Sequence, residues 1–153
     1  HTVEELVAVL AHEIGHYKKK HTLSSVGLSI IQSGLMLYIL SLFIAKDSQL
    51  AMSMAEALGA TQASFHLGIL AFGILYSPIS MILGLLLNLL SRKNEYTADQ
   101  FAGENYNPES LKLALKKLSV NHLSNLNPHP LYVFFYYSHP TLIQRLNALD
   151  EIK

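Results

Sequence analysis

Two long stretches without a charged side chain constrain this sequence more than any other feature. Residues 23–45 contain no Asp, Glu, Lys or Arg, and neither do residues 57–91, which include Pro78. A helix rises about 1.5 Å per residue, so about 20 residues cross a hydrocarbon core of about 30 Å. Helices in soluble cores seldom run that far without a charge. The sequence therefore predicts an all-α, integral membrane protein with transmembrane helices at about 23–45 and 64–90.

The composition agrees with a membrane setting and excludes several classes of function. Charged residues make up 14% of the chain, compared with about 25% in a typical soluble domain, and the formal net charge is zero. No basic patch is interleaved with aromatic residues, so we expect no nucleic acid partner. The chain has no cysteine, and any metal must therefore be held by His, Asp or Glu. We expect residues 1–153 to form a single domain that is a fragment of a longer protein.

Basic residues at the ends of the two predicted spans indicate an orientation. Five Lys or Arg residues flank the spans on one side, at positions 18–20 and 92–93, whereas the connecting loop has only Lys46. Lys and Arg are enriched in cytoplasmic loops. We therefore expect a multi-pass protein with residues 1–20 and 92–153 on the cytoplasmic side, in a bacterial inner membrane or in the endoplasmic reticulum of a eukaryote.

The first segment of the chain reads as a helix. Thr2 and Glu5 fit a capping box, and apolar residues recur at helical spacing as far as Ile14. Gly15 in the middle of such a helix costs about 1 kcal/mol relative to Ala. We therefore expect another backbone or a substrate to pass close to Gly15.

The string HEIGH at residues 12–16 is the strongest chemical motif in the sequence. His12 and His16 lie one turn apart on the same helix face, where both imidazoles can bind one zinc ion. Glu13 lies about 100° around the helix, where its carboxylate can take a proton from the attacking water and later pass it to the leaving amine. This spacing predicts hydrolytic chemistry.

A catalytic zinc ion usually has three protein ligands, so a third residue is needed. Glu95 lies on the same side of the predicted spans as HEIGH, in a helix expected to run from Asn94 or earlier to Gly103. Asp99 follows one turn later, where it could orient a ligating histidine. Four further carboxylates stay open as ligands: Glu104, Glu109, Asp150 and Glu151.

Small or polar residues follow one face of the second predicted span and end at Glu95. They are Ser80, Gly84, Asn88 and Ser91. Polar side chains within a span need other helices or water around them. The stripe therefore marks either close helix packing or a wet cavity, with Asn88 as a candidate cavity-lining residue.

The C-terminal part of the chain is expected to be helical, with loops. Asn107-Pro108 should start one helix, and residues 125–130 read as a turn-rich loop. Pro140 suits the first turn of a last helix. Four histidines have no expected role beyond loops and interfaces: His21, His66, His122 and His129.

Three sequence segments occur in an order typical of one family. HEIGHYKKKHT is followed by two spans, by LNLLSRKNEYTADQFA and by YSHPTLIQRLNAL. The chain resembles the Ste24-type CAAX prenyl proteases, which are zinc metalloproteases of the M48 class. The resemblance implies that His12, His16 and Glu95 bind one Zn²⁺ per chain in a gluzincin-type site. It further implies that Glu13 is the general base and acid and that Asp99 orients a ligand.

The resemblance also implies roles for two residues near the C-terminus. His139 would donate to the substrate carbonyl oxygen or its oxyanion, and Arg145 would be a catalytic supporting group. The implied fold is an α-helical barrel of seven membrane spans around a water-filled chamber, of which this chain would be the C-terminal catalytic part. Asn94 departs from the family pattern, where an aromatic residue is expected.

The sequence as a whole predicts a membrane-embedded zinc metalloendopeptidase in contact with membrane lipid. By resemblance, it would act on a peptide or protein substrate and remove the C-terminal tripeptide of prenylated CAAX proteins. One alternative is an HtpX-like protease for quality control of membrane proteins. Another is a non-catalytic membrane scaffold in which zinc ties helices together, and a fourth protein ligand on the metal would favour it.

Overall fold

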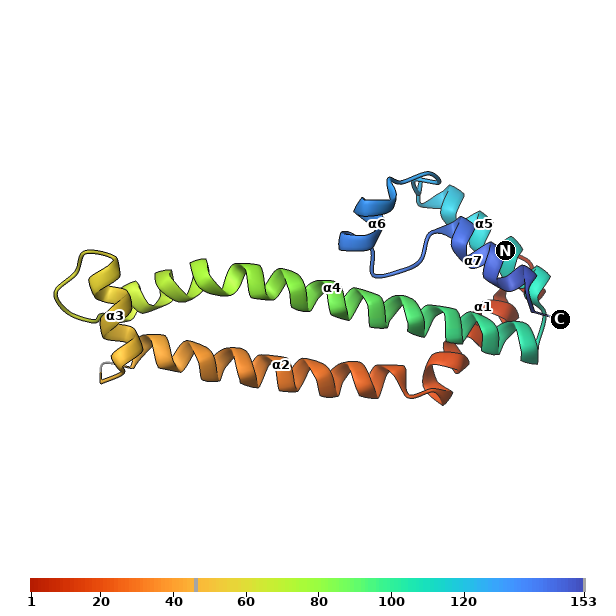
Figure 1. The fold of residues 1–153 in the computed structure, drawn as a ribbon. Helices are drawn as coiled ribbons and strands as arrows, with labels where there is room; N and C mark the ends of the chain where they lie inside the picture. The colour runs from red at the N-terminus through yellow and green to blue at the C-terminus, as the bar shows by residue number, and fades with distance from the viewer. Residues whose placement is uncertain (46, 153) are drawn as a thin grey trace. The chain divides into compact units, whose positions relative to one another are not determined.

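The computed structural model describes residues 1–45 and 47–152, and these residues form seven α-helices and no strand (Figure 1). Lys46, which counts in the orientation argument, lies outside them. The helices are α1 (Val3–Lys18), α2 (His21–Ile44), α3 (Gln49–Ala57), α4 (Phe65–Asn105), α5 (Pro108–Asn121), α6 (Pro130–Tyr136) and α7 (Leu142–Asp150). The prediction of an all-α protein is confirmed.

The described chain divides into two compact units. One contains His1–Leu23 and the residues from Gly84 onward, and the other is Ser24–Leu83. All the candidate site residues belong to the first unit. Its core is formed by five buried apolar residues from α1, α4, α5 and α7: Ala8, Ala102, Leu111, Leu115 and Leu149.

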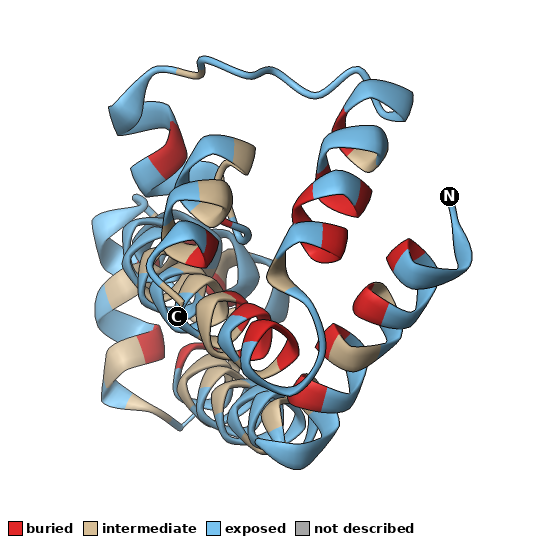
Figure 2. Ribbon diagram, turned by 90° about the vertical axis from the view of Figure 1, so that its right-hand side faces the viewer, coloured by how far each residue is buried: buried red, intermediate tan, exposed pale blue. Residues whose placement is uncertain are grey.

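Helix α1 begins as its sequence predicts. The Thr2 side chain accepts from the Glu5 backbone, and the Glu5 carboxylate accepts from the Thr2 backbone, which completes the capping box. Its buried residues, Glu5, Ala8, His12 and Gly15, recur at intervals of three and four and fall along one side of the helix (Figure 2). The same face therefore provides core packing and the first histidine of the HEIGH motif.

Helix α4 is longer than either segment predicted within it. The second predicted span, 64–90, and the predicted helix up to Gly103 form one helix from Phe65 to Asn105, with Pro78 inside it. Because the helix is continuous, Glu95 lies within its C-terminal half and not at a helix end. The two sequence signals were separated by the change from apolar to charged residues, which alters the environment of a helix and does not end it.

The second unit contains α3, most of α2 and the first part of α4. Within it, α2 and this part of α4 run antiparallel (Figure 1). The rings of Phe43 in α2 and Phe72 in α4 meet edge to face, with their centroids 5.7 Å apart. Helices α2 and α4 are long and apolar enough to cross a membrane, and only 6% of the most apolar window of each is buried. A soluble core helix would be mostly buried. That these helices cross a membrane at 23–45 and 64–90 stays a prediction.

Two helices and one helix start differ from the sequence-based prediction. Neither α3 nor α6 was predicted. Pro140 was expected in the first turn of the last helix, and this was wrong, because Thr141 and Gln144 form a capping box that starts α7 at Leu142. Pro140 therefore precedes the cap.

Candidate metal centre

The two histidines of HEIGH face each other on α1. Nε2 of His12 lies 3.1 Å from Nε2 of His16, and their ring centroids are 4.8 Å apart. His12 is buried and His16 is partly buried. A spacing of four residues on an α-helix produces this arrangement directly, so α1 presents two imidazole nitrogens to one point.

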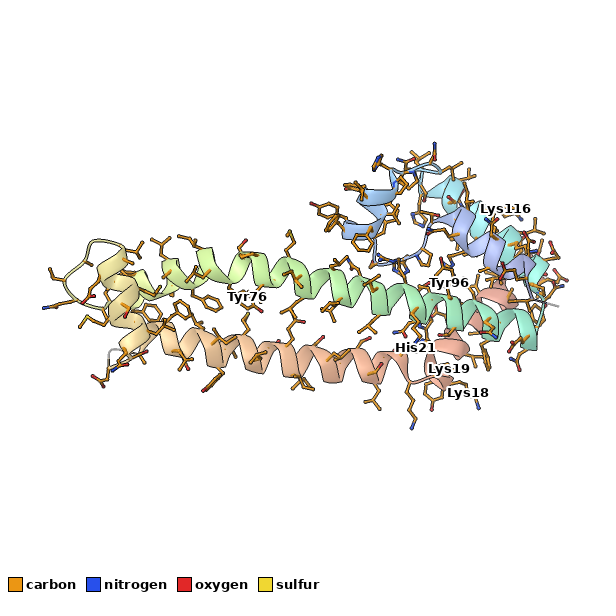
Figure 3. All side chains as sticks on the ribbon, in the orientation of Figure 1. Lys18, Lys19, His21, Tyr76, Tyr96 and Lys116 are labelled. Carbon is orange, nitrogen blue, oxygen red and sulfur yellow. The ribbon has the colours of Figure 1, made fainter. Side chains whose placement is uncertain are left out.

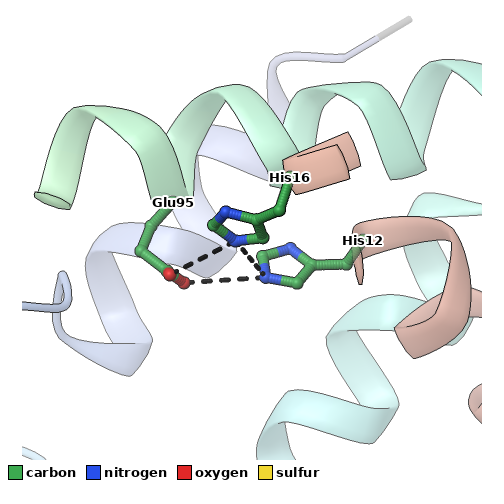
Figure 4. Close-up of side chains that lie close together, drawn as sticks. All are labelled: His12, His16 and Glu95. Carbon is green, nitrogen blue, oxygen red and sulfur yellow. Dashed lines mark hydrogen bonds and ion pairs between the residues drawn. The ribbon is translucent and has the colours of Figure 1, made fainter. Parts of the chain in front are cut away.

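Glu95 of α4 completes a group of three donors (Figure 4). Its Oε2 lies 3.7 Å from Nε2 of His12, and its Oε1 lies 3.4 Å from Nε2 of His16. All three donor atoms lie within 4.8 Å of one another. Two imidazole nitrogens and one carboxylate are donors of the types found in open zinc sites. The residues present therefore fit a divalent metal ion, although their role as ligands stays a prediction.

Asp99 lies behind His12, one turn beyond Glu95 on α4. Its Oδ1 is 2.8 Å from Nδ1 of His12, but it lies out of line with the ring N–H, so the contact is a close ion-pair contact and not a well-aligned hydrogen bond. Asp99 is 1% exposed. A buried carboxylate at Nδ1 leaves Nε2 of the same ring for the metal side.

Arg145 of α7 binds the same carboxylate through two hydrogen bonds. Its Nε donates to Oδ2 of Asp99 at 2.7 Å, and its Nη2 donates to Oδ1 at 2.6 Å. Its Nη1 lies 3.4 Å from Oε2 of Glu95. The Arg145 guanidinium therefore links Asp99 to the candidate ligand Glu95.

The electrostatics of this pair favour both charged forms. Burial alone would raise the pKa of Asp99, but the hydrogen bonds from Arg145 and the close contact with His12 outweigh it and lower that pKa below its usual range. Burial would lower the pKa of Arg145, and the hydrogen bond to Asp99 outweighs burial there too, so this pKa is raised. Asp99 thus stays ionised beside His12.

Glu13 and His139 lie at the open side of the group. A cavity of about 420 Å³ is lined by Glu13, His139, Arg145 and the three candidate ligands, with apolar residues of α1 and α5. Nδ1 of His139 is 3.2 Å from Oε1 of Glu95, and the His139 side chain is 64% exposed. Both residues can therefore reach a substrate in this cavity, and their catalytic roles stay predictions.

Asn88 lies farther along α4 and has a defined contact. Its Nδ2 donates to the carbonyl oxygen of Phe135 in α6 at 3.0 Å. Its assignment as a cavity-lining residue stays a prediction. Nearby, Arg92 donates to the carbonyl oxygens of Val133 and Tyr137 around the end of α6. The sequence signalled Arg92 only as an orientation residue.

His21 is the site residue that sequence reasoning missed. Its Nδ1 lies 3.0 Å from Nδ1 of His16, and its Nε2 lies 3.2 Å from Oγ1 of Thr97. Burial and the neighbouring His16 lower its pKa below the usual value for histidine. The only sequence signal for His21 is that it follows His16 by five residues in HEIGHYKKKH. In a continuous helix this spacing would have placed His21 on a different face from His16.

Known proteins match the chain along nearly all of its length. Residues 1–153 match peptidase family M48. The CAAX prenyl protease 1 homolog of Dictyostelium discoideum is 41% identical over 148 residues, which are 97% of this chain and 34% of that protein. The CAAX prenyl protease 1 of Saccharomyces cerevisiae is 34% identical over 164 residues, covering 99% of this chain and 36% of that protein.

A solved structure agrees with these relatives. The crystal structure of Ste24p from S. mikatae superposes with a TM-score of 0.78 at 32% identity, and the match covers 95% of this chain and 36% of that one. The chain thus spans about a third of the length of the proteins it matches. Because the family match covers all 153 residues and the fold agrees, this chain belongs to the M48 family of peptidases.

Proposed function

We propose that this chain is the catalytic part of a membrane-embedded zinc metalloendopeptidase. The observation that carries the proposal is the convergence of His12, His16 and Glu95 at one side of a cavity that Glu13 and His139 also line. Membership of a metallopeptidase family implies a metal, and the His, His and Glu donors favour one Zn²⁺ per chain in a gluzincin-type site. Residues 1–153 would act together as one peptidase domain of a longer protein.

The side chains around the cavity have distinct roles in this proposal. Bound zinc would supply Lewis acid chemistry, polarising the scissile carbonyl and acidifying the attacking water. Glu13 would take the proton of that water and transfer it to the leaving amine. His139 would donate to the carbonyl oxygen as negative charge develops there, and Arg145 would hold Asp99 and Glu95 in place while contributing positive charge.

The substrate proposed is the C-terminal CAAX tail of a prenylated protein. The relatives named above are CAAX prenyl proteases, which favours this substrate over the HtpX-like alternative. We infer that α2 and α4 contact membrane lipid or other spans of the longer protein, because their apolar side chains are exposed. The protein would be multi-pass, with its active site on the cytoplasmic side of the endoplasmic reticulum or of a bacterial inner membrane, and it would bind no nucleic acid.

Glu13→Gln in the full-length protein tests the chemistry. The amide keeps the size of the side chain but cannot accept the proton, so we expect hydrolysis of a farnesylated CAAX peptide to fall by at least about 10²-fold, with zinc retained. Zinc content and turnover are measured on the same preparation. Glu4→Gln is the matched control, because Glu4 is an exposed glutamate of the same helix.

Three results would count against the proposal. Unchanged turnover in Glu13→Gln would remove the proton-transfer role. Absence of peptide hydrolysis by the wild-type protein, with zinc bound, would favour the scaffold. Equal turnover of farnesylated and unmodified peptides would overturn the prenylated substrate and leave the metallopeptidase intact.

A further inference from the structure

A chain of hydrogen bonds runs from the outer side of His16 to the backbone of α4. It begins with the 3.0 Å contact between Nδ1 of His16 and Nδ1 of His21 and continues with the 3.2 Å contact between Nε2 of His21 and Oγ1 of Thr97. It ends where Oγ1 of Thr97 donates to the carbonyl oxygen of Asn94 at 2.9 Å. Figure 3 labels His21 at the junction of α1 and α2. The hydrogen bonds thus end at the carbonyl group of Asn94, the residue before Glu95.

Each hydrogen bond of this series is donated in the same direction, from His16 toward the backbone of α4. The single hydroxyl proton of Thr97 goes to Asn94, so Oγ1 accepts from the Nε2–H of His21. A neutral imidazole protonated at Nε2 has an acceptor at Nδ1, which then receives the Nδ1–H of His16. This leaves Nε2 of His16 with a free lone pair on the side of Glu95 and His12. That tautomer is the one a metal ligand needs.

The backbone is bent to bring His21 to this position. Helix α1 ends at Lys18, and Lys20 has φ 58°, in the left-handed region. A residue other than glycine adopts this conformation at a steric cost. Had α1 continued, residue 21 would lie about 140° around the helix from His16 and out of reach of it. The turn therefore places the His21 ring against His16, with their centroids 5.0 Å apart.

We propose that His21 is a positioning residue that fixes the tautomer and ring orientation of the zinc ligand His16. It is the counterpart of Asp99 at His12, but it is uncharged. Glu95 and Asp99 already place two carboxylates against the histidines, and a neutral acceptor orients the second histidine without adding another negative charge beside them. This inference rests on the proposed metal site.

The test compares two substitutions of His21 in the full-length protein. His21→Phe keeps a planar ring and removes the acceptor, whereas His21→Asn places an oxygen near the position of Nδ1. Loss of a residue that orients a ligand typically weakens metal binding 10–100-fold. We expect His21→Phe to weaken zinc affinity by about that factor in competition with a chelator, and His21→Asn to restore most of it. Thr97→Val, which removes the partner of His21, should weaken zinc binding less than His21→Phe.

Controls separate positioning from folding and from the existence of the metal site. His66→Phe makes the same change at a histidine of the other unit and should leave zinc affinity unchanged. Unfolding of the zinc-free proteins is measured in parallel, and if His21→Phe does not fold, the comparison of His21→Asn and Thr97→Val with wild type decides. Wild-type zinc affinity in His21→Phe would overturn the role of His21, as would wild-type affinity in Thr97→Val if His21→Phe is unfolded. The role would also be overturned if the His21→Asn variant bound zinc as weakly as the His21→Phe variant. A wild-type protein that binds no zinc would instead overturn the proposed metal site.

Discussion

Individual residues at this site have more than one partner, and these contacts link the candidate metal ligands to the helices around them. Asp99 contacts His12 on one side and Arg145 on the other, and Arg145 also reaches Glu95. A change at Asp99 therefore affects a histidine, a guanidinium and, through it, the candidate ligand Glu95. Of these effects, a change in the orientation of His12 is the one that a measurement of metal affinity would detect.

Asp99→Asn should weaken zinc binding without emptying the cavity of ligands. The neutral amide keeps the shape of the side chain but loses the negative charge that faces His12 and Arg145. We expect zinc affinity to fall about 10–100-fold, the range typical of residues that orient ligands, and turnover at limiting zinc to fall with it. Chelator competition measures the change, and Glu4→Gln, at an exposed carboxylate of the same unit, is the control. Equal affinity in Asp99→Asn and wild type would contradict this role.

Among the helices, the crossing of α1 and α4 sets the spacing of the site. A Cβ atom added at Gly15 would lie 3.1 Å from the Cα and from the carbonyl oxygen of Ala98, and 3.2 Å from Cβ of Phe101. These neighbours are mainly backbone and cannot rotate away. The expectation of a close approach at Gly15 is confirmed. Because Ala98 lies between Glu95 and Phe101 on α4, the same approach fixes the distance from HEIGH to Glu95.

Gly15→Ala should push α1 and α4 apart. The substitution gains about 1 kcal/mol of helix propensity, but overpacking against fixed backbone costs about 1–3 kcal/mol, so we expect net destabilisation and weaker zinc binding. Thermal unfolding and chelator competition measure the two effects. Gly84→Ala in α4 is the control, since the described structure has open space there, and it should not destabilise. Stabilisation of Gly15→Ala by as much as Gly84→Ala would contradict the close crossing.

A second link between helices joins α1 to α5. The carboxylate of Glu5 is 4% exposed and pairs with Lys117 of α5. This hydrogen bond is the main cause that lowers the pKa of Glu5 below 4.5. A group whose pKa is lowered in the folded state adds stability at pH values above its pKa in the unfolded state. This stability is lost as the pH falls through the pKa of the folded state. The α1–α5 contact should therefore weaken in acid.

Glu5→Gln should make the stability less dependent on acid pH. The amide oxygen can still accept from the Thr2 backbone, so the capping box is kept while the charge facing Lys117 is lost. We expect a lower unfolding temperature than wild type at pH 7 and a smaller further loss below about pH 4.5, the ordinary value from which this pKa is lowered. Unfolding curves of the zinc-free proteins from pH 3 to 7 test this. Parallel curves for the two proteins would show that Glu5 does not contribute to the acid dependence.

For the whole molecule, the sequence predicted features that depend on local signals. Caps and apolar periodicity predicted α1 and α5, and the placement of HEIGH and Glu95 on one side of two spans indicated that they could meet. What it missed depends on distant contacts or on turns. Helix α6 is seven residues rich in aromatics, poor helix formers, and Arg92 of α4 contacts its last carbonyls. His21 reaches His16 only through the left-handed turn at Lys20.

The orientation in the membrane is a property of the whole chain, and it is predicted from the distribution of charge alone. Because the residues flanking the two predicted spans carry Lys and Arg and the connecting loop is nearly free of them, the loop should lie on the side opposite the metal centre. The chain has no cysteine, so single cysteines can report each side. Thr61→Cys lies in the connecting loop and Ser124→Cys lies between α5 and α6, both at exposed positions.

In sealed endoplasmic reticulum vesicles whose cytoplasmic face is outward, the two variants should differ with a membrane-impermeant maleimide. In full-length protein with any other cysteines replaced, we expect Ser124→Cys to be labelled in intact vesicles and Thr61→Cys only after permeabilisation, because the reagent cannot cross the bilayer. Labelling of both in intact vesicles would mean that α2 and α4 do not carry the loop across the membrane. The reverse pattern would keep both spans and place the metal centre in the lumen, where it would not meet a cytoplasmic CAAX tail.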